Sequence, residues 1–201
     1  MSTAEHQGRW QQRRRTRKDL VEAAAHLLKQ GKKPSLDEVA LEADVSRATA
    51  YRYFPTIDAL IAEAALHLTV PTPEELFKGV SDDPVARVIR VDAALQETTA
   101  QNETAMRLML ARSQERRVSG DGGDMPIRQN RRSPLIEAAL APARPQFGKT
   151  ELKLLEAALA VIVGPDSWVV FRDVLQMKDE EAAKVRAWMI RSLISAAKKR
   201  N

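Results

Sequence analysis

The chain has 201 residues, of which 44% are hydrophobic and 29% charged, enough for one domain or two small ones with a buried core. The formal net charge is +5, and residues 1–55 hold eleven Lys and Arg against seven Asp and Glu, so the positive charge is concentrated in the first quarter. The absence of cysteine excludes disulfides and thiolate catalysis, and no apolar stretch is long enough to cross a bilayer. We therefore expect a soluble, cytoplasmic protein that makes no contact with membranes.

The residue usage predicts an all-α fold, because Ala, Leu, Arg and Glu are abundant and long β-branched runs are few. The histidines, His6, His26 and His67, lie far apart in the sequence, which argues against a metal cluster or a histidine-based catalytic pair. No glycine-rich phosphate loop, paired carboxylates or Ser/His/Asp set stands out. We expect no metal, no cofactor and no enzymatic activity.

The first predicted helix ends at a glycine. Apolar residues between Leu20 and Leu28 recur at helical spacing, and Gly31 stands where a glycine commonly follows a helix. The bases from Arg9 to Lys18 form a basic arm ahead of that helix. Such a run is ordinarily the solvated start of a helix, and contact with nucleic acid is the alternative.

Two short helices follow in the sequence. Ser35 is a candidate N-cap, and Glu38 stands three residues later, where its carboxylate can complete a capping box. Ser46 can cap a third helix that runs to about Phe54. A short helix, a tight turn and another short helix, preceded by a helix that packs across both, is typical of a helix-turn-helix unit.

The third helix carries the side chains that such a unit presents to the major groove of DNA. Arg47 and Thr49 suit base edges, and the hydroxyls of Tyr51 and Tyr53 are expected to reach phosphates. The alternative is that the aromatic rings at 51, 53 and 54 are all core. They cannot share one face of a helix, so at least one ring is exposed.

The stretch "SLDEVALEADVSRATAYRYFPTIDAL", residues 35–60, is similar to the DNA-binding domain of the TetR family of transcriptional regulators, and the resemblance runs from about Arg14 to Leu60. It implies an N-terminal three-helix helix-turn-helix domain with a basic arm at 1–55, and a larger helical ligand-binding and dimerisation domain at 56–201. It also implies a homodimeric repressor that a small-molecule inducer releases from a palindromic operator in double-stranded DNA. The positions that the resemblance places against DNA are Ser35, Ser46, Arg47, Thr49, Tyr51, Arg52 and Tyr53.

Two positions depart from the family pattern. Asp44 stands where many members have glycine, at a turn position that needs a left-handed backbone, which Asp tolerates better than most residues. Ile57 stands where many members have a lysine that meets phosphate. We expect the positive end of the fourth helix and the basic arm to replace part of that contact.

The remaining sequence reads as further helices with less chemical information. The sequence predicts one or two helices over residues 82–117 and a mobile loop over residues 116–134. Residues 151–163 are apolar almost all round in their second half, which is typical of a helix buried on several sides. The last helix, from about Asp179, carries an apolar stripe that fits a dimer interface or the subunit core equally well; its members are Ala182, Val185, Met189, Leu193 and Ala196.

Several apolar side chains of this second part are candidates for a ligand pocket, although Met and aromatic residues at helical spacing are more often core. They are Met106, Met109, Leu110, Trp168 and Phe171. Two alternatives to a ligand-released repressor stay open. One is a DNA-binding protein that acts through a protein partner without a ligand, and the other is a helical ligand-binding or enzymatic protein whose N-terminal unit is an interaction module.

Overall fold

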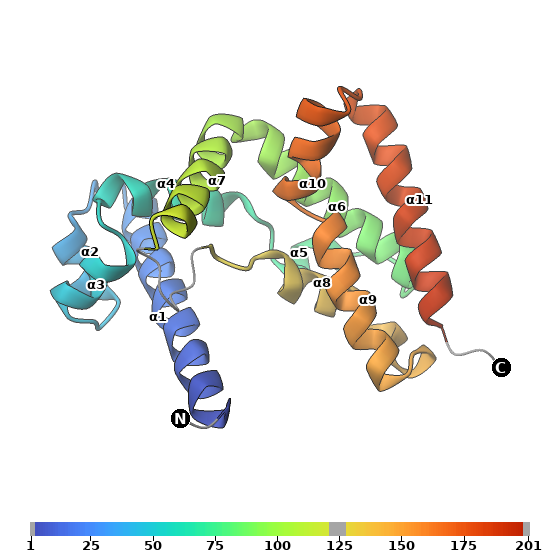
Figure 1. Cartoon of the computed structure of the whole chain (residues 1–201), viewed down its shortest axis with the longest axis horizontal. Coiled ribbons are helices and arrows are strands. Elements are labelled where there is room, and N and C mark those ends of the chain that lie inside the picture. The colour runs from blue at the N-terminus through green and yellow to red at the C-terminus, as the bar shows by residue number, and fades with distance from the viewer. Residues whose placement is uncertain (1–2, 121–127, 199–201) are drawn as a thin grey trace. The chain divides into compact units, whose positions relative to one another are not determined.

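The computed structural model describes residues 3–120 and 128–198, and side chains from residue 8 onwards within those ranges. Helices account for every regular element in these ranges, apart from an isolated bridge between Phe147 and Lys198. The prediction of an all-α fold is therefore confirmed (Figure 1).

Contacts divide the chain into two compact units, and each unit is made of two chain segments. The first unit comprises Met1–Thr69 and Asn102–Gln129, and the second comprises Val70–Gln101 and Asn130–Asn201. This division by contacts differs from the expected boundary after residue 55, because a later helix returns to pack with the N-terminal ones. The functional division at residue 55 stays a prediction.

The first unit contains the predicted helix-turn-helix (Figure 1). Its helices are α1 (Thr3–Lys29), α2 (Leu36–Glu42), α3 (Arg47–Tyr53), α4 (Ile57–Thr69) and α7 (Glu103–Val118). Helix α1 packs on α2 and α4, α2 packs on α3, and α7 packs on α4. Its fully buried core residues include Leu20, Val21, Ala24, Val39, Ala50, Leu60 and Ala64. Residues 121–127, in the predicted loop after α7, lie outside the described residues.

The basic arm is helical, contrary to the expectation of an arm ahead of the first helix. Helix α1 begins at Thr3, so the arginines at 13–15 lie within it. Ala, Gln, Glu and Arg are strong helix formers, and no proline interrupts the run before Gly31. Gly31 has φ of 74° and follows the helix, as predicted.

Local signals in the sequence position α2, α3 and α4. The capping box of Ser35 and Glu38 is present at the start of α2. The Ser46 hydroxyl accepts a hydrogen bond from the Thr49 amide at the start of α3, and Thr56 accepts one from Ala59 at the start of α4. These caps satisfy amides that have no partner within their own helix.

The turn between α2 and α3 depends on Asp44. Its φ is 52°, so the backbone there is left-handed, as expected from the family pattern. The Asp44 amide donates to the Leu41 carbonyl at 3.1 Å and the Val45 amide donates to the Ala40 carbonyl at 2.9 Å. This pair of bonds is a Schellman motif, in which glycine is the usual left-handed residue.

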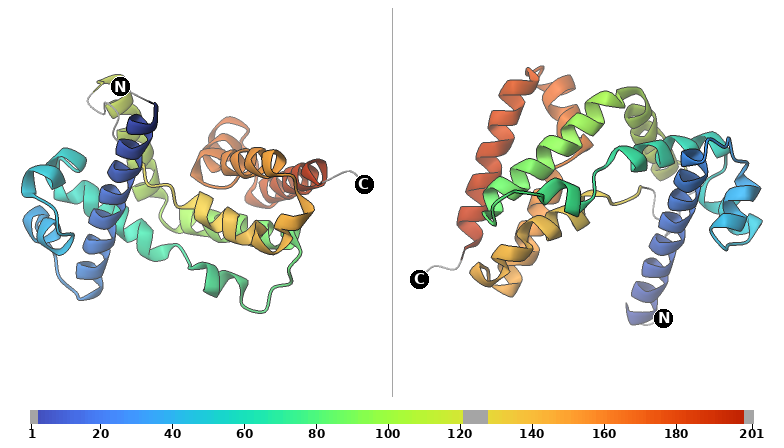
Figure 2. Two further views of the ribbon diagram at one scale, coloured as in Figure 1. Left: turned by 90° about the horizontal axis from the view of Figure 1, so that it is seen from below. Right: turned by 180° about the vertical axis from the view of Figure 1, so that it is seen from behind.

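The second unit is a helical bundle. Its helices are α5 (Pro73–Phe77), α6 (Pro84–Gln101), α8 (Arg132–Leu140), the 3₁₀ helix η1 (Ala141–Gln146), α9 (Lys149–Ile162), α10 (Pro165–Val169), the π-helical turn η2 (Val170–Val174) and α11 (Asp179–Ala197). Helix α6 contacts α8, α10 and α11, and α9 lies alongside α11 and α8 (Figure 2). The core includes Val88, Val91, Ile136, Leu159 and Ile190.

One sequence expectation about this unit is wrong for the single chain. Helix α9 is buried on one face only, because Leu154 is 67% exposed and Val161 is 70% exposed. The buried face of α11 is formed by Ala182, Arg186, Ile190 and Ile194, so it shares Ala182 with the predicted stripe, and Leu193 of the stripe packs partly buried against the core. The assignment of the stripe to a dimer interface or to the core stays a prediction. Because Arg186 lies on the buried face, the apolar periodicity of that face is interrupted. The hydrophobic pattern of the sequence therefore does not identify the face as buried.

No single helix within residues 3–120 and 128–198 has the length and apolar composition of a membrane span, although α9 and residues 165–174 pass that test as a bent pair.

Candidate DNA-binding interface

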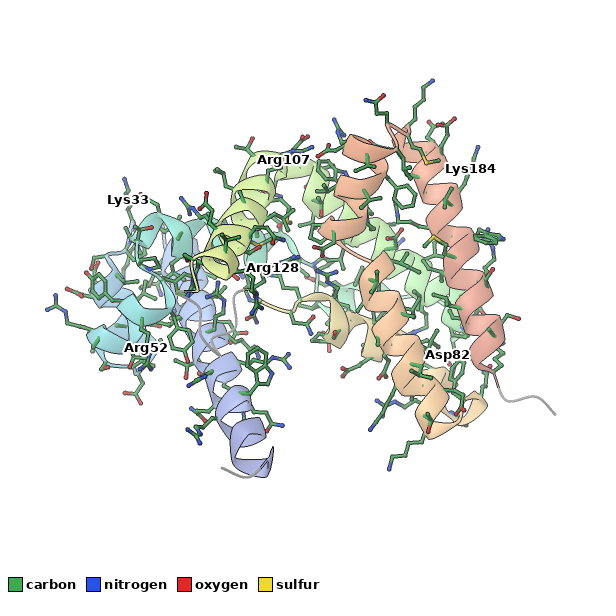
Figure 3. The ribbon with its side chains drawn as sticks, in the orientation of Figure 1. Lys33, Arg52, Asp82, Arg107, Arg128 and Lys184 are labelled. Carbon is green, nitrogen blue, oxygen red and sulfur yellow. The ribbon has the colours of Figure 1, made fainter. Side chains whose placement is uncertain are left out.

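Helix α3 has one exposed face and one buried face. Ala50 is fully buried and Tyr53 is 2% exposed, whereas Arg47, Ala48, Tyr51 and Arg52 are exposed. At 3.6 residues per turn, the exposed positions share the side of α3 opposite Ala50 and Tyr53. Arg52 projects from this helix in Figure 3. The exposed face therefore offers two guanidinium groups and a phenol hydroxyl around a small central residue, Ala48.

Arg47 is held by the helix before it. Its Nη2 atom lies 2.6 Å from Oδ2 of Asp37 on α2, and the two side chains are 72% and 40% exposed. An exposed ion pair of this kind contributes about 0–1 kcal/mol, so a phosphate or a guanine edge can compete for the guanidinium.

The short hydroxyl residues of the predicted interface serve first as helix caps. Ser35 Oγ donates to Glu38 Oε2 at 2.8 Å, and Ser46 Oγ donates to Thr49 Oγ1 at 2.8 Å. Thr49 is half-buried at the edge of the exposed face, and the two serines are exposed. Each hydroxyl keeps lone pairs or protons for a further partner, because an Oγ–H group donates once and accepts twice.

The two tyrosines differ in position. Tyr51 is 49% exposed on the open face of α3, whereas Tyr53 packs into the core of the unit with Phe54. The expectation that Tyr53 reaches a phosphate is not supported by this burial, because the ring points into the core from the opposite side of the helix. We leave Tyr53 out of the DNA-contacting set.

The comparisons with known proteins match this unit. Residues 20–64, from α1 to α4, match the family model described as "Bacterial regulatory proteins, tetR family". These residues form a tetR-family DNA-binding domain. No curated protein and no solved structure matches the chain at a significant level. The matched domain indicates a DNA-binding transcriptional regulator, and the helix-turn-helix formed by α2 and α3 lies within it.

The candidate pocket residues fall into different units. Met106, Met109 and Leu110 lie on α7 in the first unit; Met106 is buried and the other two are half-buried. Trp168 on α10 and Phe171 on η2 are buried in the second unit. Met109 lines a cavity in the first unit, and the two aromatic residues line another cavity in the second.

Arg186 lines the second-unit cavity, of about 210 Å³, and belongs to a buried ion pair that the sequence did not predict. Arg186 Nε donates to Asp92 Oδ2 at 2.9 Å, with both side chains less than a tenth exposed. Burial raises the pKa of the Asp92 carboxyl, although the hydrogen bond from Arg186 opposes that shift. The guanidinium also lies over Phe171, 5.6 Å from the ring centroid.

Gln96 also lines this cavity, together with the charged residues Glu97, Arg172 and Asp179. Its Nε2 donates to Asp92 Oδ1 and to the Gly164 carbonyl, both at 3.3 Å. Its Oε1 is buried, and the residues that the structure describes supply no donor for it. Within the described ranges, no group of three or more His, Cys, Asp or Glu side chains is arranged to hold a metal ion.

Proposed function

We propose that the protein is a cytoplasmic homodimeric repressor that leaves a palindromic operator when a small molecule binds within residues 56–201. The observation that carries the DNA-binding part is the exposed face of α3, which presents Arg47, Tyr51 and Arg52 on one side of a helix that is anchored by Ala50 and Tyr53 on the other. A helix in the major groove needs this arrangement of donors around a low surface.

Each side chain of the interface has a proposed role. Arg47 and Thr49 read base edges, and Tyr51 and Arg52 contact phosphates. Ser35 and Ser46, at the N-termini of α2 and α3, add contacts to the DNA backbone by turning their hydroxyl protons from Glu38 and Thr49 to phosphate oxygens, while their oxygens still accept from the capped amides.

The proposed dimer forms through α9 and α11. Leu154 and Val161 on α9 and Trp188 on α11 are each more than 60% exposed in the single chain, and α9 and α11 pack alongside each other (Figure 2). Large exposed apolar side chains on adjacent helices are typical of an interface with another chain. A two-fold dimer also supplies a second recognition helix. Two such helices read enough base pairs to bind the operator much more tightly than non-specific DNA.

The proposed small-molecule site is the cavity of Trp168 and Phe171. The aromatic walls suit a flat apolar body, while the Arg186 guanidinium and the Gln96 amide oxygen offer a donor and an acceptor to its polar groups. A ligand there would have to favour a dimer whose recognition helices are wrongly spaced for the operator.

The experiment is a gel shift and footprint with the DNA that flanks the protein's own coding region. A palindromic footprint whose half-sites lie about 34 Å apart, or near a multiple of that distance, supports the proposal. Linkage requires operator DNA to weaken the binding of a releasing ligand by the same factor as the ligand weakens operator binding. Operator binding without a ligand effect would favour action through a protein partner, and absence of any specific footprint would refute the DNA-binding role of α3.

A further inference from the structure

The first unit contains a cavity of its own, of about 280 Å³, beneath the end of the recognition helix. Its walls come from α1, the junction between α3 and α4, α4 itself and α7. All of these elements belong to the same compact unit, which also carries the DNA-binding face. The cavity is therefore separate from the one around Trp168 and Phe171.

Arg17 of α1 lines this cavity and is only 4% exposed. Its Nη2 atom donates to Glu63 Oε2 on α4, and its guanidinium stacks over the Phe54 ring at 4.3 Å. Its Nε and Nη1 atoms are also buried, and they meet no acceptor among the residues that the structure describes. A buried cationic donor without an acceptor is costly, so an arginine in this state is suited to an acceptor that arrives from outside the chain.

The surrounding charges favour an anion. Three arginines line the cavity, Arg17, Arg112 and Arg116, against two glutamates, Glu63 and Glu115. Burial lowers the pKa of the Arg17 guanidinium; Glu63 opposes this shift, and the positive charge of Arg116 adds to it. Glu63 thus neutralises the positive charge around Arg17 only in part. A second negative charge would reduce the electrostatic repulsion between Arg17 and Arg116.

The rest of the lining is apolar. Phe54, Pro55, Ala62, Leu108 and Met109 contribute to the walls. Leu108 is 50% exposed although it lies next to this cavity. An apolar wall beside a buried cation is the chemistry of a site that binds an amphipathic anion, because the body of the ligand covers the wall and its charged group meets the donors.

We infer that this cavity binds a small organic anion with a compact apolar body, inside the DNA-binding unit itself. The site adjoins the recognition helix directly, since Arg116 Nη1 donates to the carbonyl of Tyr53, the last residue of α3, at 3.4 Å. Its anionic group lies among Arg17, Arg112 and Arg116, and its apolar body lies against Phe54, Ala62 and Met109.

The test compares three probes that share a naphthalene body and differ in their polar group: 2-naphthoate, 2-naphthylmethanol and 2-naphthylmethylamine. Each is titrated calorimetrically into the full chain without DNA, so the result does not depend on the proposed repressor function. We expect saturable binding in the order anion, alcohol, amine, with about tenfold or more between the first two, because charge-assisted hydrogen bonds are roughly twice as strong as neutral ones.

Matched variants assign the binding to this cavity. Ala62→Leu fills the lining from α4, whereas Ala65→Leu adds the same groups at an exposed position of the same helix that does not line the cavity. Arg112→Glu reverses a lining charge on α7, whereas Arg117→Glu reverses an exposed charge on the same helix that does not line the cavity. We expect only the first member of each pair to weaken 2-naphthoate binding, by about tenfold or more, with thermal unfolding by circular dichroism as the folding control.

Three results would overturn the inference. The first is an absence of saturable 2-naphthoate binding, which would indicate that buried water satisfies the Arg17 nitrogens. The second is equal binding of the anion, the alcohol and the amine. The third is undiminished 2-naphthoate binding by a folded Ala62→Leu variant, which would place the probe elsewhere, for example beside Arg186.

Discussion

Asp37 on α2 fixes Arg47 on α3, with 2.6 Å between Oδ2 and Nη2. The carboxylate thereby orients the guanidinium of the proposed base-reading residue, and it also places a negative charge next to the proposed path of the DNA backbone. The orientation of Arg47 favours binding to the cognate site and so raises specificity. The negative charge of Asp37 repels any DNA and so lowers affinity for all sequences.

Asp37→Asn should therefore strengthen binding to unrelated DNA by about two- to fivefold and reduce the preference for the operator, consistent with the small energy of an exposed ion pair. The measurement is fluorescence anisotropy with operator and scrambled duplexes at two salt concentrations. Asp19→Asn, which removes an exposed charge from α1, is the control. Weaker binding to both duplexes would contradict the assigned role of Asp37.

The proposed base and phosphate contacts predict different mutant behaviour. Arg47→Ala and Thr49→Ala should each cost about 1–3 kcal/mol on the operator and relax the preference at particular base pairs. Tyr51→Phe removes only a hydroxyl from an exposed ring and should weaken binding to all sequences roughly equally. A panel of operator variants measures both. If Tyr51→Phe changed base preference while the other two did not, the proposed roles would have to be exchanged.

The left-handed turn residue between α2 and α3 predicts a pair of stability effects. Asp44→Val should destabilise the first unit by about 1–2 kcal/mol or more, because a β-branched residue is strained at a φ of 52°. Asp44→Gly should be close to neutral, since glycine adopts this conformation freely but orders more on folding. Urea unfolding followed by circular dichroism compares the two. An equal loss in both variants would show that the Asp44 side chain, and not the backbone, matters.

Acid should loosen the start of α2. The hydrogen bond from the Ser35 amide, at 2.7 Å, and then the Ser35 hydroxyl lower the pKa of the Glu38 carboxyl below its ordinary value of 4.5. A lowered pKa means that the stabilisation is fully present above pH 4.5 and is lost as the pH falls through the folded value. Hydrogen exchange of the Ser35 amide should accelerate over that acid range beyond its intrinsic pH dependence.

Glu38→Gln is the variant that tests this acid effect, because glutamine keeps the capping geometry without a titrating group. We expect its Ser35 protection to change little with acid. Asp19→Asn should behave as the parent chain. Parent-like acid dependence in Glu38→Gln would assign the effect to another carboxylate.

The proposed dimer predicts that a charge on α9 separates the subunits. Val161→Asp should sediment as a monomer of about 22.4 kDa at micromolar concentration, whereas the parent chain should sediment at about twice that mass. Leu41→Glu is a matched control, since Leu41 is 83% exposed on α2. A monomeric parent chain that binds its operator tightly would refute the proposed assembly.

The parts of the fold that local chemistry determines could be predicted from the sequence. Ser35 and Ser46 begin helices where their hydroxyls cap amides, and Gly31 and Asp44 end helices where the backbone is left-handed. The information for each of these features lies within a few residues of chain. That is why the helix-turn-helix and its exposed face were accessible to sequence analysis.

The parts that depend on distant partners could not be predicted. Arg17 meets Glu63 across 46 positions of the sequence, and Arg186 meets Asp92 across 94. A charged residue on a helix is predicted to be exposed to solvent unless a buried partner is known. The sequence analysis therefore did not predict either ion pair. The burial of Tyr53 was missed for a related reason, because the composition of α3 does not reveal which of its sides packs into the core of the unit.

Because α7 belongs to the first unit, the DNA-binding unit cannot be isolated as one continuous N-terminal fragment. The chain passes between the two units after Thr69, after Gln101 and after Gln129, and only Asn102 separates α6 of one unit from α7 of the other. A fragment that stops at Thr69 would omit α7 and expose the face of α4 on which α7 packs. A fragment that contains the whole first unit would therefore have to join its two chain segments, with a new linker from Thr69 to Asn102.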